Sequence, residues 1–403
     1  MKDLVRSLLP QWIINNFYHL PLAFLTNIFY GFPTKKLKVI GVSGTDGKTT
    51  TVNMIYQVLT SAGKKVSMVS TINAVVGGKN YDTGLHVTSP DPFKLQKFAR
   101  QAVNNGDEFL VLEVTSHSLD QYRFWGIKFE VGVITNITHE HLDYHQSWEN
   151  YFTTKLKLLK DVNFAVVNEK IKGDLGSKEN RANQVITFGL HNGDFNQRDL
   201  KLKLKIPGDY NIENALAALA VAFVLDIPKE ITQKSLEKFR GIKGRMEGIK
   251  NKKGIKIIVD FAHTPNGLEQ ALKTLRSHIR SGKLIALIGA EGYRDVSKRS
   301  LMGEIAQKLS DIVVVTAVDP RGQMDVINKQ ISEGAKKAGA KKDLNFFVIE
   351  DRMKALDFAI NELATKGDTI GIFGKGHEKS MNLDGKKELP WSDREAIKKV
   401  LNG

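Results

Sequence analysis

A glycine-rich loop between a strand-like run and a helix-like run constrains the fold of this chain more than any other feature. Residues 37–42 form an apolar run short enough for a buried strand, and a helical pattern follows residue 50. The loop at residues 41–50 reads GVSGTDGKTT. Glycines allow backbone N–H groups to close around phosphates, and a helix N-terminus adds the positive end of its dipole. In such a loop Lys48 is expected to reach the β- and γ-phosphates and the Thr49 hydroxyl to ligate Mg²⁺. The sequence therefore predicts a nucleotide-binding loop, although Val42 replaces the first glycine of the strict pattern.

Strand patterns alternate with helical ones along the rest of the chain, which predicts an α/β fold with parallel sheets. The 403 residues allow two or three domains. We expect a short apolar N-terminal segment at 1–36, a P-loop central domain at 37–243 and a Rossmann-like C-terminal domain at 244–403. The Gly- and Lys-rich stretch 240–251 is interpreted as a linker. Strands are predicted at 37–42, 65–69, 109–114, 131–134, 255–259, 284–288, 312–315 and 369–373, and helices at 148–159 and 211–224.

The N-terminal segment carries no Asp, Glu, Lys or Arg from residue 7 to residue 34, but it is rich in aromatic residues. Pro10 and Pro21 interrupt it and polar residues dilute it, which disfavours a secretory signal and a membrane-spanning helix. Two interpretations remain. The segment either packs on the next domain or makes an interfacial, aromatic-rich membrane contact.

Composition narrows the class of protein. Lys and Arg total 59 against 44 Asp and Glu, a formal charge of +15, which favours anionic partners such as nucleotides, nucleic acid or a membrane surface. The absence of cysteine excludes disulfides, zinc fingers, iron–sulfur clusters and thiol nucleophiles, and it fits a cytoplasmic enzyme. A basic P-loop protein that binds nucleic acid is an alternative of a different class. No nucleic-acid recognition motif stands out and the basic residues are scattered, so nucleic acid is not expected as a partner.

Acidic and histidine side chains follow two of the predicted strands. Glu113 ends the strand at 109–114, where a carboxylate can face the metal ion of a nucleotide. Residues 138–145 then hold three histidines and two carboxylates without the helical spacing of a zinc protease. Since Mg²⁺ prefers oxygen ligands, a single histidine would be a minority ligand beside phosphates. Lys155 lies on the predicted helix that follows.

Nine motifs in one order resemble the Mur ligase family, from about residue 37 to the C-terminus. They are GTDGKTT (44–50), TSPDP (88–92), LEVTSHSLDQYR (112–123), HLDYH (141–145), GDYNIENALAA (208–218), GRME (244–247), DFAHTPNGL (260–268), YRDVSKRSLMG (293–303) and GKGHE (374–378). The resemblance implies an ATP-dependent amide ligase of peptidoglycan synthesis, and thus of cell-wall biogenesis, cell shape and division.

The most similar branch of the family adds the third amino acid of the stem peptide. In that branch ATP phosphorylates the terminal carboxylate of UDP-N-acetylmuramoyl-L-Ala-D-Glu, and the amine of meso-diaminopimelate or L-lysine attacks the acyl phosphate. Another ligase of the superfamily, similar to folylpolyglutamate synthase, is the alternative within the enzyme class. A scaffold without activity is disfavoured because the motif residues are intact.

The resemblance also implies roles for individual residues. Catalytic roles fall on Lys48, His141, Lys155 and Arg245. The Mg²⁺ ligands are Thr49, Glu113, His141 and Lys155, the last as a carbamylated lysine whose carboxylate-like group stabilises a metal ion. ATP is bound by Gly44, Thr45, Asp46, Gly47, Lys48, Thr49, Thr50, Asn214, Arg245, Asp260 and His263. The muramoyl-peptide is bound by Thr88, Ser89, Thr115, Ser116, Gln121 and Arg123, and the incoming amino acid by Arg294, Asp319, Arg321, Gly374 and Glu378.

Two departures from the family pattern matter for the substrate. Family members that add diaminopimelate carry Asp-Asn-Pro-Arg, whose Arg pairs with the extra carboxylate, whereas this chain reads Val318-Asp319-Pro320-Arg321. Arg321 favours diaminopimelate and Asp319 favours a cationic amine such as lysine; the balance tips slightly to diaminopimelate. The 36 residues before the P-loop strand are too few for the family's UDP-binding domain. We expect that the short aromatic segment replaces this domain, that the substrate is not held by its uridine, or that a partner supplies the contact. We expect a monomer.

Overall fold

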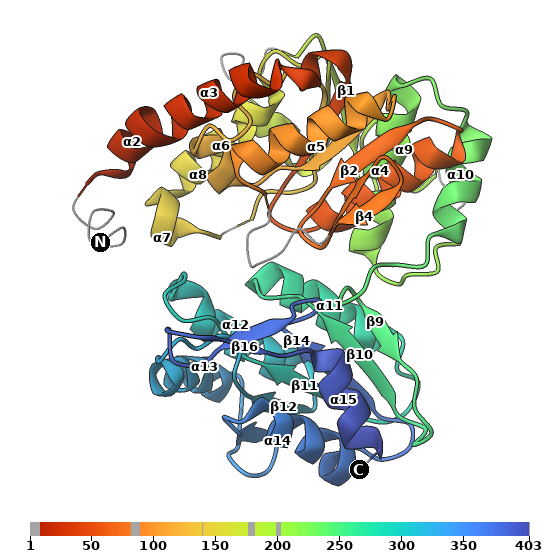
Figure 1. Cartoon of the computed structure of the whole chain (residues 1–403). Coiled ribbons are helices and arrows are strands. Elements are labelled where there is room, and N and C mark those ends of the chain that lie inside the picture. The colour runs from red at the N-terminus through yellow and green to blue at the C-terminus, as the bar shows by residue number, and fades with distance from the viewer. Residues whose placement is uncertain (1–8, 82–88, 139, 176–181, 199–202, 403) are drawn as a thin grey trace. The chain divides into compact units, whose positions relative to one another are not determined.

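The computed structural model describes residues 9–81, 89–138, 140–175, 182–198 and 203–402 (Figure 1). These residues form two compact units. The first takes in the chain up to residue 139, then 145–205 and 209–239; the second takes in 140–144, 206–208 and 240–403, as far as each is described. Both units are α/β with sheets of mainly parallel strands, which confirms the predicted fold class.

The sheet of the first unit has eight strands in the order β4-β3-β2-β5-β1-β6-β7-β8. From β2 to β8 neighbouring strands in this order run parallel, and β3 and β4 add an antiparallel edge. Their bounds are β1 (Lys38–Ser43), β2 (Val66–Val69), β3 (Ala74–Val76), β4 (Lys79–Tyr81), β5 (Phe109–Glu113), β6 (Phe129–Ile134), β7 (Phe164–Asn168) and β8 (Gln184–Phe188). The four strands predicted for this unit are all present.

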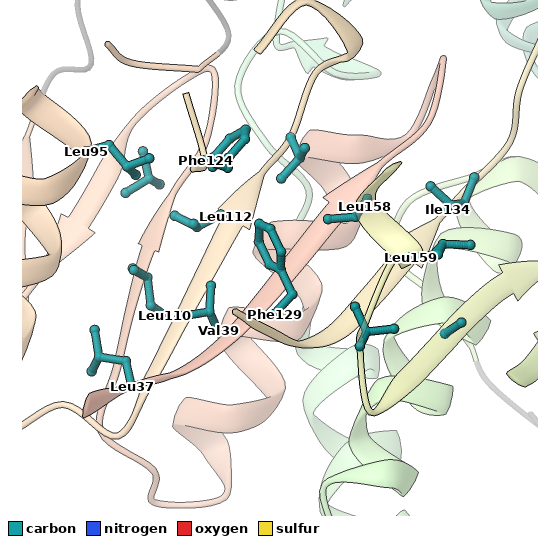
Figure 2. Packing of buried hydrophobic residues seen from close by; sticks show 14 of the residues in the cluster. Leu37, Val39, Leu95, Leu110, Leu112, Phe124, Phe129, Ile134, Leu158 and Leu159 are labelled. Carbon is teal, nitrogen blue, oxygen red and sulfur yellow. The ribbon is translucent and has the colours of Figure 1, made fainter. Parts of the chain in front are cut away.

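Helices cover this sheet because its central strands are apolar on both faces, as expected for a parallel sheet. The α-helices that the structure describes in this unit are α2 (Gln11–Ile14), α3 (Leu20–Tyr30), α4 (Lys48–Ser61), α5 (Pro92–Asn104), α6 (Ser116–Asp120), α8 (Trp148–Leu156), α9 (Asp209–Val224) and α10 (Lys229–Lys238). The short α7 (Leu142–His145) lies mostly within residues 140–144, which are grouped with the second unit. Figure 2 shows one part of the core, where Val39 of β1 and Leu110 and Leu112 of β5 lie in the same buried cluster as Leu95 of α5.

The N-terminal segment forms helices that pack on the first unit, which confirms the interpretation of a packed segment. The Asn27 side chain of α3 donates a hydrogen bond to the Trp125 carbonyl oxygen (2.9 Å), and the ring of Tyr30 lies edge-on to Phe93 of α5 (5.1 Å). Between α2 and α3 the chain forms a π-helical turn (Asn15–His19). Pro21 accounts for this wider turn because it has no N–H for the carbonyl four residues earlier. Among the described residues, no helix has the length and apolar character that crossing a bilayer requires.

The sheet of the second unit has six strands in the order β13-β12-β11-β14-β10-β9. Five of them are parallel; β9 pairs antiparallel with β10 at the edge. The elements are β9 (Glu247–Ile249), β10 (Lys256–Asp260), α11 (Pro265–Ser277), β11 (Leu284–Ile288), α12 (Ser297–Leu309), β12 (Ile312–Val315), α13 (Met324–Lys337), β13 (Phe346–Val348), α14 (Arg352–Asp357), β14 (Thr369–Phe373), the β15–β16 hairpin (Ser380–Asn382 and Glu388–Pro390) and α15 (Asp393–Asn402).

Strand β9 corrects the interpretation of residues 240–251 as a linker. The glycines and lysines of this stretch gave no apolar pattern typical of a strand. In the structure Ile249 pairs with Ile257 of β10 and packs against the core of the second unit. An edge strand tolerates such composition because only one of its sides must pair.

Candidate active site

Two glycines of the loop between β1 and α4 cannot be replaced without a clash. Gly47 has φ +83° as the residue before α4, and a Cβ there would lie 2.3 Å from Asn214 Oδ1. A Cβ on Gly44 would lie 1.8 Å from Thr135 Oγ1. The loop is therefore held tightly against β6 and α9. Asn214, predicted as a nucleotide contact, lies directly against this loop and accepts a hydrogen bond from Thr51 (3.2 Å).

Other predicted loop residues fix the shape of this turn. The Thr45 hydroxyl lies 2.9 Å from the Tyr151 hydroxyl and accepts a hydrogen bond from the backbone N–H of Thr138 (2.9 Å). The backbone N–H of Asp46 donates to Asn136 Oδ1 (2.9 Å), and Thr50 is buried in the first turn of α4. Asn136 and Tyr151 were missed by sequence reasoning; a polar residue shortly after a buried strand is the signal that could have found Asn136.

Two lysine ammonium groups meet at one backbone carbonyl of the loop. Lys48 Nζ donates to the carbonyl oxygens of Gly44 (3.0 Å) and Thr45 (2.7 Å). Lys155 Nζ donates to the same Gly44 oxygen (2.6 Å) and lies 4.7 Å from the centre of the Tyr151 ring. The Lys155 side chain is only 2% exposed, so little water screens its charge. This concentration of positive charge can bind phosphate groups, and it favours any change that turns one ammonium into an anion.

Thr49 and Glu113 supply the oxygen donors of the predicted metal site. The Thr49 hydroxyl donates to both carboxylate oxygens of Glu113 (3.0 and 3.1 Å), and the backbone N–H of Thr71 donates to Oε2 (2.8 Å). Parallel pairing places Glu113 beside Val42 at the carboxyl ends of β5 and β1. A buried carboxylate and a hydroxyl are the oxygen ligands that Mg²⁺ prefers, so these residues fit the predicted ion.

His141 is not described together with the other predicted metal ligands. The structure brings Lys48, Thr49, Glu113 and Lys155 together in the first unit, whereas His141 belongs to residues 140–144, which are grouped with the second. Its neighbour Glu140 forms a buried ion pair with Lys298 of α12 (2.9 Å). Sequence reasoning missed this pair, because the two residues lie 158 positions apart.

His145, the last residue of the HLDYH motif, packs against Tyr151, whose hydroxyl contacts Thr45 of the glycine-rich loop. Its ring lies 5.3 Å from that of Tyr151 and 5.6 Å from that of His117. Burial lowers its pKa to about 4; Asp120 acts in the opposite direction, and the positive charge of Lys155 adds to the lowering. The imidazole is therefore neutral at pH 7 beside the cationic loop.

Most residues predicted to bind the muramoyl-peptide form a hydrogen-bonded group around the end of β5. Ser89 Oγ donates to the Glu113 carbonyl oxygen (3.1 Å), and Arg123 Nη1 donates to the Ser89 carbonyl oxygen (2.6 Å). Arg123 also donates to Gln121 Oε1 through Nε (3.0 Å) and Nη2 (2.7 Å). Thr115 caps α6, whose first residue Ser116 is buried. Thr88 lies outside the described residues.

In the second unit, Arg245, Asp260 and His263 gather at the carboxyl end of β10. The Asp260 carboxylate accepts the backbone N–H groups of Met246 (2.7 Å) and Ala262 (2.7 Å). The guanidinium of Arg245 lies 4.6 Å from the centre of the Phe261 ring. The centre of the His263 ring lies 4.5 Å from the same ring centre. The three predicted nucleotide contacts are thus brought together around one aromatic ring.

A buried lysine joins two of the residues predicted to bind the amino acid. Lys375 Nζ donates to Asp319 Oδ1 (3.0 Å) and Glu378 Oε2 (2.5 Å), and neither Lys375 nor Asp319 is more than 1% exposed. The backbone N–H of Asn382 donates to the same Asp319 oxygen (2.9 Å). Lys375 was not among the predicted residues, although it lies within the GKGHE motif, between Gly374 and Glu378.

Glu291, which the sequence analysis also missed, lies among the predicted arginines. Its carboxylate is 3.2 Å from Arg294 Nε, and one of its oxygens lies within 4.8 Å of carboxylate oxygens of Asp319 and Glu378. Burial alone would raise the pKa of Glu291, but nearby positive charges, including those of His263, Lys298, Arg294 and Arg321, lower it to about 2. Glu291 follows the buried strand β11 by three residues, and this position of a charged residue is the signal that could have identified it from the sequence.

Two stretches of the chain match known protein domains. Residues 42–222 match the Mur ligase middle domain, and residues 244–376 match the Mur ligase, glutamate ligase domain. Among known proteins, a UDP-N-acetylmuramoyl-L-alanyl-D-glutamate–2,6-diaminopimelate ligase of Clostridium botulinum is 36% identical, over 94% of this chain and 81% of its own length.

Solved structures of related ligases share the fold of this chain. A structure of a UDP-N-acetylmuramoyl-L-alanyl-D-glutamate–2,6-diaminopimelate ligase is 28% identical with a TM-score of 0.59, over 91% of this chain and 78% of that one. The Mycobacterium tuberculosis folylpolyglutamate synthase superposes with a TM-score of 0.69, covering 88% of this chain and 92% of that one, but at 18% identity it shows the fold alone.

Proposed function

The chain belongs to the Mur ligase family of ATP-dependent ligases, and on this premise we propose that it adds diaminopimelate, or lysine, to UDP-N-acetylmuramoyl-L-Ala-D-Glu in peptidoglycan synthesis. The observation that carries the proposal is the loop after β1, where Lys48 and Lys155 converge and Thr49 meets Glu113. Relatives of the chain at about 35% identity are named as ligases of this substrate.

The residues of the loop bind and orient ATP. Lys48 would leave the carbonyl oxygens of Gly44 and Thr45 for the phosphates, and the backbone N–H groups of the loop would close around them. Thr49 and Glu113 would hold Mg²⁺, which neutralises phosphate charge when bound. Asn214 in the first unit, and Arg245, Asp260 and His263 in the second, are proposed to contact the nucleotide. Lys155, carbamylated, and His141 would add to the metal ligands.

The proposed reaction has two steps, phosphorylation of the dipeptide carboxylate and attack of the amine on the acyl phosphate. A carboxylate oxygen of the dipeptide attacks the γ-phosphorus, and the bond from that phosphorus to the bridging oxygen of ADP breaks. The amine of the incoming amino acid then attacks the acyl carbon and loses a proton to solvent, and phosphate departs as the amide forms. Ser89, Thr115, Ser116, Gln121 and Arg123, with Thr88, are proposed to hold the muramoyl-peptide.

The incoming amino acid is proposed to bind among Arg294, Asp319, Arg321, Gly374 and Glu378, with diaminopimelate favoured over lysine. The case for lysine rested on the added negative charge of Asp319. That carboxylate is ion-paired with the buried Lys375, which weakens its attraction for a cationic substrate. Arg321 donates a long hydrogen bond to the Gly292 carbonyl oxygen (3.3 Å), which a carboxylate ligand would easily replace.

The test is ADP release by the purified chain with ATP, Mg²⁺, UDP-muramoyl dipeptide and a panel of amino acids, followed by mass spectrometry of the product. The proposal requires ADP release that depends on both the dipeptide and one amino acid. Salt-sensitive nucleic-acid binding without such release would instead favour the basic P-loop alternative.

Three further parts of the proposal concern the chain as a whole. Its proposed domains are 1–36, 37–243 and 244–403. It is proposed to act as a cytoplasmic monomer, and residues 7–34 are proposed to contact a membrane peripherally.

A further inference from the structure

Helix α2, the π-helical turn and α3 follow one another without a break over residues 11–30, and we call them together the N-terminal helix. This helix buries a polar stripe against the rest of the first unit. The residues buried between 11 and 30 are Asn15, His19, Ala23, Thr26 and Asn27, which recur at spacings of three and four and so form one stripe. Asn15 Nδ2 donates to Asp120 Oδ2 (2.7 Å), and Asn27 donates to the Trp125 carbonyl oxygen. The contact with the first unit therefore combines these hydrogen bonds with edge-on ring contacts, of Phe24 with Trp125 (5.2 Å) and of Tyr30 with Phe93 (5.1 Å).

The opposite stripe of the same helix is apolar and faces outward. Phe17, Leu25 and Phe29 are 75%, 62% and 72% exposed. The other large apolar residues exposed between residues 11 and 30 are Trp12, Tyr18, Phe24 and Ile28. Figure 1 shows α2 and α3 running along one side of the first unit, next to α5. This polarity is the reverse of that of a surface helix in water, whose apolar stripe faces the core.

The apolar stripe continues onto α5 and has a basic border. Phe93 of α5 is half exposed, and its ring lies 5.8 Å from that of Phe29 on a centroid basis. Lys97 is exposed one turn further along α5, on the same side as Phe93. Lys35 and Lys36 are exposed directly after the charge-free segment, and Lys35 Nζ lies 4.6 Å from the centre of the Phe32 ring. A continuous strip of exposed apolar side chains with lysines at its border indicates a binding surface.

We propose that this face, defined by Trp12, Phe17, Phe24, Leu25, Ile28, Phe29 and Phe93, lies in the interfacial layer of a bilayer that contains anionic lipids. An interfacial helix lies in the plane of the membrane with its apolar face buried and aromatic rings at the headgroup level. Lysines next to such a face are attracted by anionic headgroups, and the net charge of +15 acts in the same direction. The inference deepens the peripheral contact in the proposed function and is independent of ligase activity.

Lipid fits this face better than another protein does. A protein interface is enriched in Arg and depleted in Lys, whereas the charges at the border of this face are the lysines Lys35, Lys36 and Lys97, and residues 7–34 contain no Arg. None of the described helices is long and apolar enough to span a bilayer, but an interfacial helix does not need to span it. The hydrogen-bonded polar stripe would then anchor the protein to the lipid-bound helix.

The experiment is co-sedimentation of the full chain with vesicles of phosphatidylcholine alone and of phosphatidylcholine with phosphatidylglycerol. We expect binding to the anionic vesicles, with weakening as salt is raised. The variant carries Phe17→Ser, Leu25→Ser and Ile28→Ser; each side chain half withdrawn from water contributes roughly fivefold, so binding should fall about a hundredfold. The matched control carries Val326→Ser, Leu344→Ser and Leu389→Ser, three exposed apolar residues of the second unit, and should bind as the parent does.

Trp12 gives an independent readout, because its fluorescence should shift to the blue on the anionic vesicles, and Trp12→Phe should lose this shift while still binding. The proposal is overturned if neither vesicle binds the chain, or if the triple variant binds as tightly as its control. It is also overturned if light scattering shows a dimer that the triple variant abolishes, since the face would then join two copies. ADP release by both variants with soluble substrates tests the ligase function separately.

Discussion

Lys155 provides the sharpest test of the proposed site, through the variant Lys155→Ala. The side chain is buried and its Nζ lies 2.6 Å from the Gly44 carbonyl oxygen, to which Lys48 also donates. In the proposed enzyme the neutral amine of Lys155 reacts with CO₂, which forms an N–C bond and releases a proton, and the resulting carbamate faces positive charge. A carbamate about 4 Å from a cation is stabilised by about 4 kcal/mol at an effective dielectric constant of about 20.

If that interaction is made chiefly in the transition state, its loss slows turnover about a thousandfold. The assay is ADP release at saturating ATP, dipeptide and amino acid. Added bicarbonate should not restore Lys155→Ala, because the variant has no amine to carbamylate. Formate or acetate should restore it in part, because a small carboxylate can enter the space left by the side chain. The matched control is Lys157→Ala, whose exposed ammonium forms a loose pair with Asp120 (3.4 Å) and should matter little.

Near-normal turnover of Lys155→Ala would refute the reasoning and remove Lys155 from the metal site. A fold defect would also lower turnover, so the thermal midpoints of the variant and the parent must be compared. Partial rescue by a carboxylate cannot come from an unfolded protein. With ¹³C-labelled bicarbonate, a carbamate signal should appear in the parent and be absent from Lys155→Ala.

Three other changes test separate parts of the structure. Arg321→Ala should lower kcat/KM for diaminopimelate by about a hundredfold, the value of a charged hydrogen-bonded pair, with a much smaller effect for lysine; equal losses would mean that Arg321 does not read the distal carboxylate. Gly44→Ala should weaken ATP binding by more than about tenfold in calorimetry, because its Cβ meets Thr135, whereas Gly63→Ala, also at positive φ but with open space around it, should bind normally. Arg352→Met should cost about 3–5 kcal/mol of unfolding free energy in urea, because it leaves the buried Asp393 carboxylate without its guanidinium; adding Asp393→Leu should recover most of the loss.

The fold was predictable where local sequence determines it. Buried parallel strands are short apolar runs, so β1, β5, β11 and β14 could be found from composition alone. The N-terminal helix was harder, because Pro10 and Pro21 suggested a broken segment. Proline is tolerated in the first turn of a helix, and the π-helical turn before α3 absorbs the missing donor. Strand β9 was missed because an edge strand carries little apolar signal.

The site was predictable where its residues follow a strand directly, and not where they meet through tertiary structure. Lys48, Thr49 and Glu113 each follow or end a strand, so the carboxyl edge of the sheet collects them. No spacing rule connects Lys375 with Asp319, which lie 56 positions apart, or Lys298 with Glu140. The roles assigned to individual residues stay predictions.

The replacement of Asn by Asp in the motif around Arg321 is best understood together with Lys375. Alone, Asp319 would add a negative charge at a buried position, where an unpaired carboxylate is costly. Paired with Lys375, it leaves the group of charged side chains in balance. Glu140, Glu291, Asp319 and Glu378 carry four negative charges, and Arg294, Lys298, Arg321 and Lys375 carry four positive ones. A balanced group gives no net preference for lysine, which has a charge of +1, over diaminopimelate, which is neutral overall. Selectivity must then come from the fit of individual groups, and the guanidinium of Arg321 is suited to a second carboxylate, which lysine lacks.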